Sequence, residues 1–571
     1  MKAIRGSVAL LRQLHRDGVQ TLFGNPGTVE EGLLDALHDV PEIRYIAGLQ
    51  ESVVLAMADG HARTTHRPAV AQVHAAVGLG NAMAMLYQAH RNHTPLLIFA
   101  GEAPSSHIAF DGFLGGDLAR IAEPVTKWSA RVTHEHQLLR MVRRALKIAA
   151  TPPQGPVFLA LPMEVLDSFI EDDLATTTFI DTETSFSHEF TARIAQELIE
   201  ATAPIFLVGD GVALSHGQKA LKALSEAVGA RVFGVDFADL SASFRDPMFM
   251  GLLGHSFGHV TRQTTLGADL LIAVGTPIFP ELFPSHEPYF QPGAKLFHVD
   301  FDAWEVGKNF PVEAGGVGNP RLFFEQVLAD FETRAENSTR ERATARQKAV
   351  TAEKKAARVA LQAKFDAERA QNPMMPSEMM GIVASEIPDG TLVYDESISS
   401  TDELLHFLQP HDPTSYFLGR GGCIGVGWPG AVGAALAHPD RQVLALSGDG
   451  SASYVLQVLW TAAKYQTNVV FVVCNNRSYR ILKVNMLHYW AEQGLPIREF
   501  PPFDLTDPEL DFSQIAHGFG VSGVQVETPE EFRQALQTAF SRNGPSLIDV
   551  LIEGSVDEEM QTIVRAHSGY A

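Results

Sequence analysis

The stretch VLALSGDGS, residues 443–451, ends an apolar run with a glycine-flanked aspartate. A second apolar run, NVVFVVC at 468–474, leads directly into Asn475 and Asn476, with 24 residues between Gly450 and that pair. The residues between the two runs include ASYVLQVLWTAAKY, which has the composition of a helix. A strand, a helix and a second strand in this order form a parallel unit, so both polar turns are expected at one edge of a sheet. The stretch therefore predicts an α/β fold with a site at the carboxyl ends of two strands.

The chemistry of these turns suits a diphosphate and a hard metal ion. Glycines let the backbone approach phosphate oxygens, and the free N–H groups at the start of a helix bind them. Asp449 and the side-chain oxygen of Asn476 are ligands of the kind that Mg²⁺ prefers, and the backbone carbonyl of Ser478 can complete the set. Taken singly, each turn is also a common structural feature. The cofactor-binding residues expected here are Gly448, Asp449, Gly450, Ser451 and Asn476.

Working outward, apolar β-branched runs alternate with helical stretches along the whole chain, which is typical of parallel α/β units. The runs fall into three sets, each sufficient for its own sheet, so we expect three doubly wound parallel-sheet domains. An acidic, Thr-rich stretch at 171–187 reads as a crossing linker, and an Ala-, Lys-, Arg- and Glu-rich stretch as a helical connector. The predicted boundaries are a first domain at 1–175, a central domain at 188–332, a helical linker at 333–372 and a last domain at 373–571.

Composition narrows the class of protein. The 571 residues carry a formal net charge of −23, and an acidic surface disfavours nucleic acid and anionic membrane as partners. Two cysteines, Cys423 and Cys474, exclude a disulfide scaffold and fit a reducing compartment. No run of 18 apolar residues occurs. We therefore expect a cytoplasmic protein without membrane segments.

Further motifs lie in the first and last thirds of the chain. They are FGNPGT at 23–28, LQE at 49–51, ADGHAR at 58–63, VHAAVGLGN at 73–81, KWS at 127–129, PQGPV at 153–157 and WTAAKY at 460–465. With these motifs the chain resembles the benzoylformate decarboxylase branch of the acetolactate synthase and pyruvate decarboxylase superfamily of thiamine-diphosphate enzymes. The resemblance spans nearly the whole chain and implies a pyrimidine-binding first domain, a central Rossmann-like domain and a diphosphate-binding last domain. It also implies thiamine diphosphate and Mg²⁺ as cofactors.

Two positions are implied to act on the cofactor. Glu51 occupies the family's position for the carboxylate that hydrogen-bonds N1′ of the pyrimidine and makes the neighbouring 4′-imino nitrogen basic. It follows the apolar run YIAGLQ, where a carboxylate needs a partner. Ile424, in GGCIGVG, falls at the position of the apolar wedge that bends the cofactor, although ordinary core packing is the alternative.

Two further positions are implied to act on the substrate. A hydroxyl after the N-P-G turn binds the substrate carboxylate in this branch; Thr28 stands where serine is usual. His74 matches a histidine that takes part in proton transfer, and an imidazole near neutrality suits that role. With Glu51, these are the expected catalytic residues.

Departures from the family pattern concern the substrate pocket. The second active-site histidine of the family aligns with Leu282, and His286 lies four residues further along. Ile481 and Asn485 stand where a small residue and a bulky aromatic are typical for an aryl substrate. Benzoylformate itself is therefore not the expected substrate, and both aryl and aliphatic 2-oxo acids stay open.

The predicted activity is non-oxidative decarboxylation of a small-molecule 2-oxo acid to an aldehyde and CO₂. The alternative is an acetolactate-synthase-like carboligase, or a 2-hydroxyacyl lyase, with the same cofactor. Loss of the second histidine favours ligation if it slows protonation. Two other motifs have alternative interpretations. GHSFG at 254–258 matches a hydrolase nucleophile elbow, but no strand is expected directly before it. VGDGVALSHG at 208–217 is compatible with a nucleotide-binding turn or with a vestigial spacer domain.

Assembly is also implied by the resemblance. In this family the pyrimidine-side and diphosphate-side motifs meet across a subunit interface, so Glu51 and His74 of one chain are expected to face Asp449 and Asn476 of another. A homodimer is then the minimum functional unit, and a homotetramer is the expected assembly.

Overall fold

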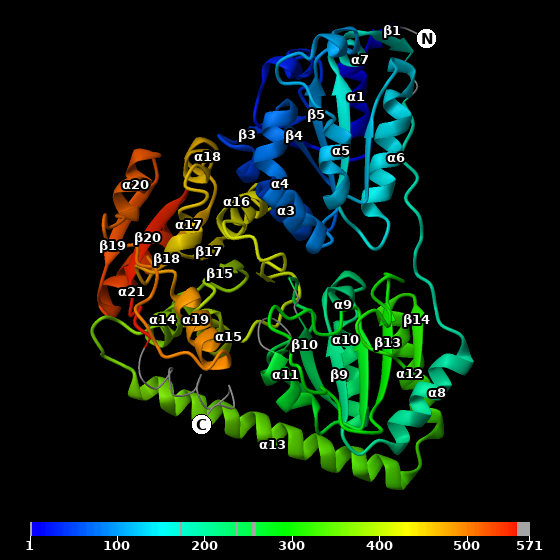
Figure 1. Ribbon diagram of the computed structural model, residues 1–571, viewed down its shortest axis with the longest axis vertical. Coiled ribbons are helices and arrows are strands. Elements are labelled where there is room, and N and C mark those ends of the chain that lie inside the picture. Colours follow the sequence, from blue (N-terminus) through cyan, green and yellow to red (C-terminus); the bar gives the residue numbers. More distant parts are fainter. Residues whose placement is uncertain (1–2, 172–173, 236–237, 254–257, 557–571) are drawn as a thin grey trace.

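The computed structural model describes residues 3–171, 174–235, 238–253 and 258–556. Three six-stranded parallel sheets form three α/β domains, which confirms the predicted fold class (Figure 1). A small antiparallel pair, β1 (Ala3–Arg5) with β8 (Phe169–Glu171), joins the start of the first domain to its end. Within the described residues, no helix combines the length and the apolarity that a membrane crossing requires.

The first domain contains a sheet in the order β3-β2-β4-β5-β7-β6, with helices on both faces. Its strands are buried apolar runs such as LLIFAGE and VFLALP, which is the pattern of a parallel sheet covered on both sides. The strands are β2 (Thr21–Gly24), β3 (Arg44–Ala47), β4 (Ala69–Val73), β5 (Leu96–Glu102), β6 (Trp128–Arg131) and β7 (Val157–Pro162). The helices are α1 (Gly6–Arg16), α2 (Glu31–Ala36), α3 (Glu51–Thr65), α4 (Ala75–Arg91), α5 (Leu118–Ala122), α6 (Leu138–Ala150) and α7 (Met163–Asp167).

The third domain repeats this arrangement. Its sheet runs β16-β15-β17-β18-β20-β19, which is the same order as in the first domain when each set is ranked along the chain. The strands are β15 (Leu392–Glu396), β16 (Tyr416–Phe417), β17 (Val443–Gly448), β18 (Val469–Asn475), β19 (Ser522–Val526) and β20 (Ser546–Leu551). The helices are α14 (Pro376–Glu386), α15 (Thr401–Leu408), α16 (Gly427–Ala437), α17 (Asp449–Ala452), α18 (Val458–Tyr465), α19 (Arg480–Glu492), α20 (Phe512–Gly518) and α21 (Pro529–Ser541).

The middle domain has a different sheet, ordered β11-β10-β9-β12-β13-β14. Ranked along the chain this is 3-2-1-4-5-6, the order of a Rossmann fold, with its switch point between β9 and β12. The strands are β9 (Pro204–Val208), β10 (Arg231–Val235), β11 (Phe249–Leu253), β12 (Leu270–Val274), β13 (Lys295–Asp300) and β14 (Ala314–Val317). The helices are α8 (His188–Glu200), α9 (Asp210–Leu214), α10 (Gln218–Val228), α11 (Gly258–Thr265) and α12 (Pro320–Arg334).

A 31-residue helix, α13 (Asn337–Ala367), runs from the middle domain along the edge of the molecule to the third domain (Figure 1). Only four of its residues are buried, and most of its length faces solvent. Arg346 donates to the carbonyl oxygens of Ala201 and Val228, and Lys354 to those of Phe244 and Asp246, so the helix is fixed to the middle domain by its long cations.

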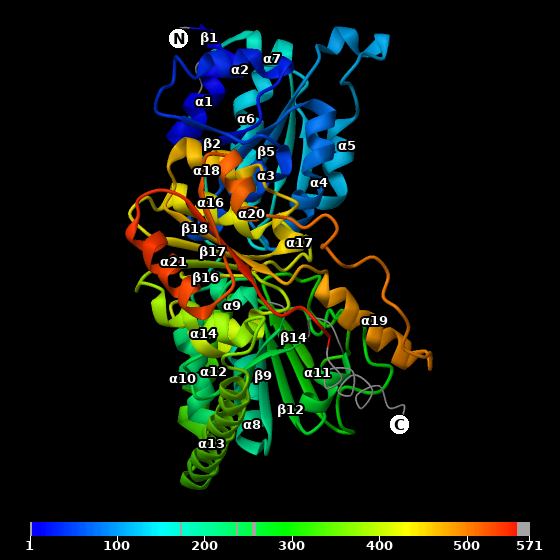
Figure 2. The ribbon, with the colours of Figure 1, turned by 90° about the vertical axis from the view of Figure 1, so that its left-hand side faces the viewer.

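The first and third domains share one hydrophobic core, formed where α3 crosses α16 (Figure 2). The crossing is close because glycines stand at the contact. A Cβ at Gly60 would collide with the backbone of Gly430, and one at Gly433 with the carbonyl oxygen of Met57. Close helix approach of this kind leaves no room for side chains between the two backbones. The middle domain, in contrast, encloses two apolar clusters on the two faces of its own sheet.

Candidate active site

Glu51 is the first residue of α3 and is only 4% exposed. Gln50 caps the helix, since its side-chain oxygen accepts from the backbone N–H groups of Ser52 and Val53. One carboxylate oxygen of Glu51 accepts from the Asn81 amide at 3.0 Å. Gly78 lies against the other oxygen, where a Cβ would stand 2.6 Å from it. A buried carboxylate at a helix start, approached by glycine, is suited to receive an N–H or protonated nitrogen from a ligand.

His74 lies against the N-P-G turn that precedes Thr28, and it is held there by Glu30, a residue that sequence reasoning missed. His74 Nδ1 is 2.8 Å from Glu30 Oε2, and the other Glu30 oxygen accepts from the N–H of Gly101 at 2.8 Å. Glu30 is buried, and its burial raises its pKa although the His74 hydrogen bond opposes the rise. Thr28 is exposed, two residues before Glu30. The Glu30 carboxylate therefore fixes the orientation of the imidazole.

The turn around His74 is tightly packed. A Cβ at Gly27 would overlap the His74 ring, so only glycine fits the N-P-G turn at that point. Ala75, the residue after His74, has φ +46°, a left-handed conformation that is uncommon for alanine. Such local strain persists where surrounding contacts impose it, and it often accompanies functional sites. Nothing in the sequence singles out Glu30 or Ala75, because their roles depend on this three-dimensional packing.

Ile424 lies half-buried in a glycine-rich loop between β16 and α16. The carboxylate of Glu396, at the end of β15, accepts three backbone N–H groups from this loop, those of Gly425, Val426 and Gly427, at 2.6 to 3.2 Å. Burial raises the pKa of Glu396 to about 7 although all three hydrogen bonds lower it. Glu396 ends an apolar strand in the sequence LVYDE, which is the same signal that Asp449 gives.

Helix α4 links the Ile424 loop to the Glu51 region. Gln88 accepts from the N–H of Cys423 and Asn92 from that of Arg420, at 3.2 Å each. Asn81, the partner of Glu51, lies seven residues before Gln88, about 10 Å along the helix axis. This one helix therefore spaces Glu51 from the loop that carries Ile424.

Asp449 and Asn476 meet at the carboxyl ends of β17 and β18, as their positions in the sequence predict. Asp449 Oδ2 and Asn476 Oδ1 both accept from the N–H of Ser478, at 3.1 and 3.0 Å. Asp449 is buried, and burial raises its pKa to about 6. Asn475 instead turns into the core, where its amide donates to Asp549. The two converging oxygens are hard donors suited to Mg²⁺.

The turn at 448–451 differs in one respect from the expectation. The helix after it is broken: α17 ends after one turn, and α18 begins only at Val458. The Ser453 hydroxyl donates to the carbonyl oxygen of Asp449 at 2.8 Å, a bond that competes with helix continuation. Gly448 faces open space, since a Cβ there would meet nothing within 4 Å, and Gly450 is closely approached by the Tyr479 ring. Ser451 is buried in the same turn.

The predicted pocket residues lie on two elements. Ile481 and Asn485 are four residues apart and half-buried on the same face of α19. Leu282 and His286 lie on the loop between β12 and β13; Leu282 is 70% exposed and His286 is exposed. Tyr289 shapes this loop by accepting from the N–H of Ser285 and donating to Glu281. The middle and third domains approach here, since the rings of His259 on α11 and His488 on α19 lie 5.9 Å apart.

The site residues form two groups in one chain. Within the described residues, the side chains of Glu51 and His74 form hydrogen bonds inside the first domain, and those of Asp449 and Asn476 form them inside the third. The structure thus brings together His74 with Gly27 and Glu30, on either side of Thr28 in the chain, and Asp449 with Asn476 and Ser478. Each group presents donors or acceptors that fit one half of a cofactor with a pyrimidine and a diphosphate.

A small cavity of about 50 Å³ lies beside the switch point of the middle domain and is also lined by His93 and Pro152 of the first domain. Its lining includes Gly211, Gly275 and Arg420, and the Arg420 guanidinium reaches in from the third domain to pair with Asp210 at 3.1 Å. Pockets that bind drug-sized ligands are about 300–1,000 Å³. This volume supports the spacer interpretation of VGDGVALSHG. Residues 254–257 of the GHSFG motif lie outside the described residues. The residues directly before them form strand β11, so the expectation that no strand precedes the motif was wrong.

Three family models of thiamine pyrophosphate enzymes match the chain. The N-terminal TPP binding domain matches residues 4–121, the central domain residues 191–327 and the C-terminal TPP binding domain residues 399–550. Benzoylformate decarboxylase of Pseudomonas aeruginosa is 30% identical, covering 94% of this chain and 97% of that protein. The acetolactate synthase large subunit of Haemophilus influenzae is 25% identical, covering 97% and 96%.

Solved structures agree with these matches. A thiamine diphosphate-dependent 4-hydroxybenzoylformate decarboxylase of Rhodococcus jostii RHA1 superposes with a TM-score of 0.83 at 28% identity, covering 97% of this chain and 100% of that one. Benzoylformate decarboxylase of Polynucleobacter necessarius superposes with a TM-score of 0.84 at 26% identity, covering 97% and 99%.

Proposed function

The chain belongs to the thiamine pyrophosphate enzymes, and on that basis we propose that it decarboxylates a 2-oxo acid to an aldehyde and CO₂ with thiamine diphosphate and Mg²⁺. The observation that carries the proposal is the paired geometry: a buried Glu51 at one helix start, and Asp449 with Asn476 converging on one N–H. When bound, thiamine diphosphate would supply a carbon nucleophile for the 2-oxo carbonyl and a cationic ring that takes up the electron pair left when CO₂ departs.

In this proposal each site residue has a separate role. Glu51 holds a proton against N1′ of the pyrimidine, and Ile424 packs beneath the cofactor. Asp449, Asn476 and the Ser478 carbonyl hold Mg²⁺, while the 448–451 turn receives the diphosphate. Thr28 binds the substrate carboxylate. His74, oriented by Glu30, delivers the proton that completes the aldehyde.

The substrate we propose is more polar than benzoylformate. We assign Ile481 and Asn485 of α19 to the substrate pocket, and Asn485 contributes an amide to it. Leu282 is an apolar side chain at the position where the family has its second active-site histidine. Decarboxylases named for benzoylformate or its 4-hydroxy derivative share the fold. The proposed substrates are therefore an aryl 2-oxo acid with a polar substituent or a short aliphatic 2-oxo acid.

The deciding experiment is a panel of aryl and aliphatic 2-oxo acids incubated with the protein, thiamine diphosphate and Mg²⁺, with CO₂ and aldehyde both quantified. We expect equal amounts of the two from at least one acid. Glu51→Gln should lower kcat by about 10²–10⁴-fold, the range for loss of a positioned acid–base group. Release of CO₂ that Glu51→Gln leaves unchanged contradicts the assignment.

Carboligation is the second candidate, and Leu282 is the observation that favours it. Without an imidazole at that position, protonation competes less well with addition to a second aldehyde or 2-oxo acid. Acetolactate synthases are also among the relatives. A coupled hydroxyketone in place of free aldehyde, measured in the same panel, identifies this outcome.

We also propose a homodimer as the minimum active unit, arranged as a homotetramer in the cytoplasm, with domains at 1–175, 188–332 and 373–571 and a linker at 333–372. The hydrogen bonds of the site residues support it, because those of Glu51 and His74 stay in the first domain and those of Asp449 and Asn476 in the third, so that a second chain can supply the other half. Sedimentation at assay concentrations tests it. A fully active monomer contradicts it.

A further inference from the structure

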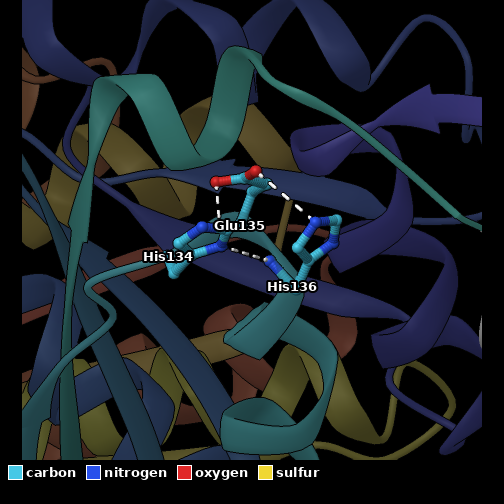
Figure 3. A group of neighbouring side chains, drawn as sticks. All are labelled: His134, Glu135 and His136. Carbon is cyan, nitrogen blue, oxygen red and sulfur yellow. Dashed lines mark hydrogen bonds and ion pairs between the residues drawn. The ribbon is translucent and has the colours of Figure 1, made fainter.

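A cluster of ligand atoms lies outside the proposed active site, on the turn between β6 and α6. His134, Glu135 and His136 turn their side chains toward one another there, with the carboxylate between the two rings (Figure 3). His134 Nδ1 is 3.1 Å from one carboxylate oxygen, and His136 Nε2 is 3.7 Å from the other. All three ligand atoms lie within 4.8 Å of one another.

These separations are close to those of a transition-metal site. Zn²⁺ binds imidazole nitrogen and carboxylate oxygen at about 2.0–2.2 Å, so neighbouring ligands of a tetrahedral ion stand roughly 3.4 Å apart. The distances of 3.1 and 3.7 Å lie on either side of that value, although they end on different carboxylate oxygens, and His134 Nδ1 also accepts the N–H of His136 at 3.4 Å. Binding one ion therefore requires side-chain rotations in these exposed residues. Two imidazoles and one carboxylate suit Zn²⁺, Cu²⁺ or Ni²⁺ far better than Mg²⁺, which prefers oxygen alone.

The turn is already held in shape. The N–H of Gln137 donates to the carbonyl oxygen of His134 at 2.9 Å, and the Thr133 hydroxyl donates to the Gln137 side chain at 3.1 Å. The imidazoles are 55% and 68% exposed, so solvent reaches the cluster from outside. A metal ion bound here keeps at least one coordination position for water.

We propose that His134, Glu135 and His136 bind one divalent transition-metal ion of the Zn²⁺ class, at a surface site separate from Asp449 and Asn476. The folded turn already holds the three ligand atoms within 4.8 Å of one another, whereas the unfolded chain must first order them. Bound metal therefore stabilises the folded protein by mass action, reduced by whatever the three consecutive residues bind when unfolded.

The test is a Zn²⁺ titration by calorimetry of the Mg²⁺-loaded protein, with Cu²⁺ electron paramagnetic resonance to count imidazole ligands. His134→Ala and His136→Ala should each lower the affinity for one Zn²⁺ ion by about tenfold or more. The matched control is His188→Ala, which removes an exposed imidazole that pairs with Asp330 alone. Wild type and control should also show a Zn²⁺-dependent rise in Tm that both site variants lose.

Equal Zn²⁺ binding by wild type and the two site variants overturns the proposal. So does an equal loss in His188→Ala, which indicates adventitious binding to surface histidines. Because all substituted imidazoles are exposed, none of the variants is expected to unfold.

A different contact carries a second inference. Two side chains of α18, in the third domain, bind the backbone of β3 in the first. The N–H of Ala47 donates to the Tyr465 hydroxyl at 2.9 Å, and that hydroxyl donates to the carbonyl oxygen of Tyr45 at 3.3 Å. The Thr461 hydroxyl donates to the carbonyl oxygen of Ala47 at 3.1 Å.

Strand β3 is at the edge of its sheet and pairs with β2 on its other side. An edge strand presents backbone groups that need partners. Thr461 and Tyr465 are four residues apart, so they project from one face of α18 and take the place of a neighbouring strand.

This contact joins two elements, each of which lies close in the chain to one of the two groups of site residues. Strand β3 leads through Gly48, whose N–H donates to the Gly24 carbonyl, to Glu51 four residues after Ala47. Helix α18 follows the short α17 that begins at Asp449. We infer that Thr461 and Tyr465 are positioning residues for Glu51, an inference that rests on the proposed role of Glu51.

Tyr465→Phe and Thr461→Val remove the hydroxyls and keep the side-chain volume. Amide hydrogen exchange in residues 45–51 should become faster in both variants, while the urea midpoint changes little. In the active enzyme kcat should fall severalfold with KM nearly unchanged. Tyr87→Phe, a change at an exposed tyrosine of α4, is the control.

Unchanged exchange at 45–51 in both variants overturns the positioning role. Faster exchange without any change in kcat also overturns it, because the contact is then structural alone. Failure of the wild type to bind thiamine diphosphate instead refutes the proposed function, and the exchange measurement separates these results.

Discussion

The pair of Glu30 and His74 determines how a proton can be handled in the first domain. Glu30 is buried, and its second carboxylate oxygen accepts a hydrogen bond from the N–H of Gly101, so the carboxylate cannot turn away from the imidazole. Nδ1 of the ring lies 2.8 Å from this carboxylate and is the nitrogen that donates to it. Nε2 is then the ring nitrogen left for proton transfer.

Glu30→Gln should therefore lower kcat by about 10²-fold with KM nearly unchanged, because an amide holds the imidazole orientation less firmly than a carboxylate does. The measurement is kcat and KM of the enzyme loaded with thiamine diphosphate and Mg²⁺. Glu31→Gln changes the adjacent exposed glutamate and should leave both constants as they are. An unchanged kcat in Glu30→Gln contradicts this role.

At the scale of elements, the loop that carries Ile424 depends on one carboxylate. Glu396 accepts all three N–H groups from residues 425–427, and glutamine in its place offers one acceptor and an opposing NH₂. Glu396→Gln should lower the free energy of unfolding by about 1–3 kcal/mol, the usual cost of buried donors left unpaired. Urea unfolding measures it, with the exposed Glu527→Gln as control.

The same carboxyl gives a pH dependence with a definite sign. The folded state raises the Glu396 pKa from 4.5 to about 7, so folded protein binds this proton more tightly than unfolded chain. Its contribution to stability is full below pH 4.5 and is lost as the pH rises to about 7. The stability of wild type relative to Glu396→Gln should fall across that window and then level off. A difference that rises with pH contradicts the shift.

Sequence patterns predicted interior elements well and edge elements poorly. Apolar runs such as those at 270–274 and 231–235 coincide with β12 and β10, because a strand buried on both faces must be apolar throughout. Strands with the sequences WSAR, AGGV, YF and SGVQV gave no such signal. They are β6, β14, β16 and β19, all at sheet edges. An edge strand pairs on one side only and needs no continuous apolar run.

The candidate site shows the same limit. Asp449 and Asn476 were predictable because both end apolar strands and sheet geometry brings such ends together. Their convergence on Ser478 agrees with that reasoning, while the metal itself stays a prediction. Glu30 was not predictable, since its importance lies in contacts with His74 and Gly101, 44 and 71 residues away.

At the scale of the whole molecule, buried charges join the three domains. Arg420 of the third domain pairs with Asp210 of the middle domain, and Arg63 of the first pairs with Asp239 at 2.7 Å. Asp210 also accepts the N–H groups of Ala238 and Asp239, which links the two pairs. These contacts fix the middle domain against the other two.

Arg420→Met should destabilise the protein by about 3–5 kcal/mol, because it leaves the Asp210 carboxylate buried without its cation. Adding Asp210→Asn should recover part of the loss. Arg193→Met, which breaks an exposed pair with Glu313, should cost no more than about 1 kcal/mol. Urea unfolding followed by two probes measures all three. Equal effects of the buried and exposed changes contradict the bridging role.

The glycine crossing of α3 and α16 also decides how this protein can be recombined. Because Gly60 rests on Gly430 and Gly433 on Met57, the first and third domains interlock through matched surfaces that admit no added atom. A chimaera that takes its first domain from a relative must take α16 from the same parent, whereas the middle domain, held by polar pairs, is the module open to exchange.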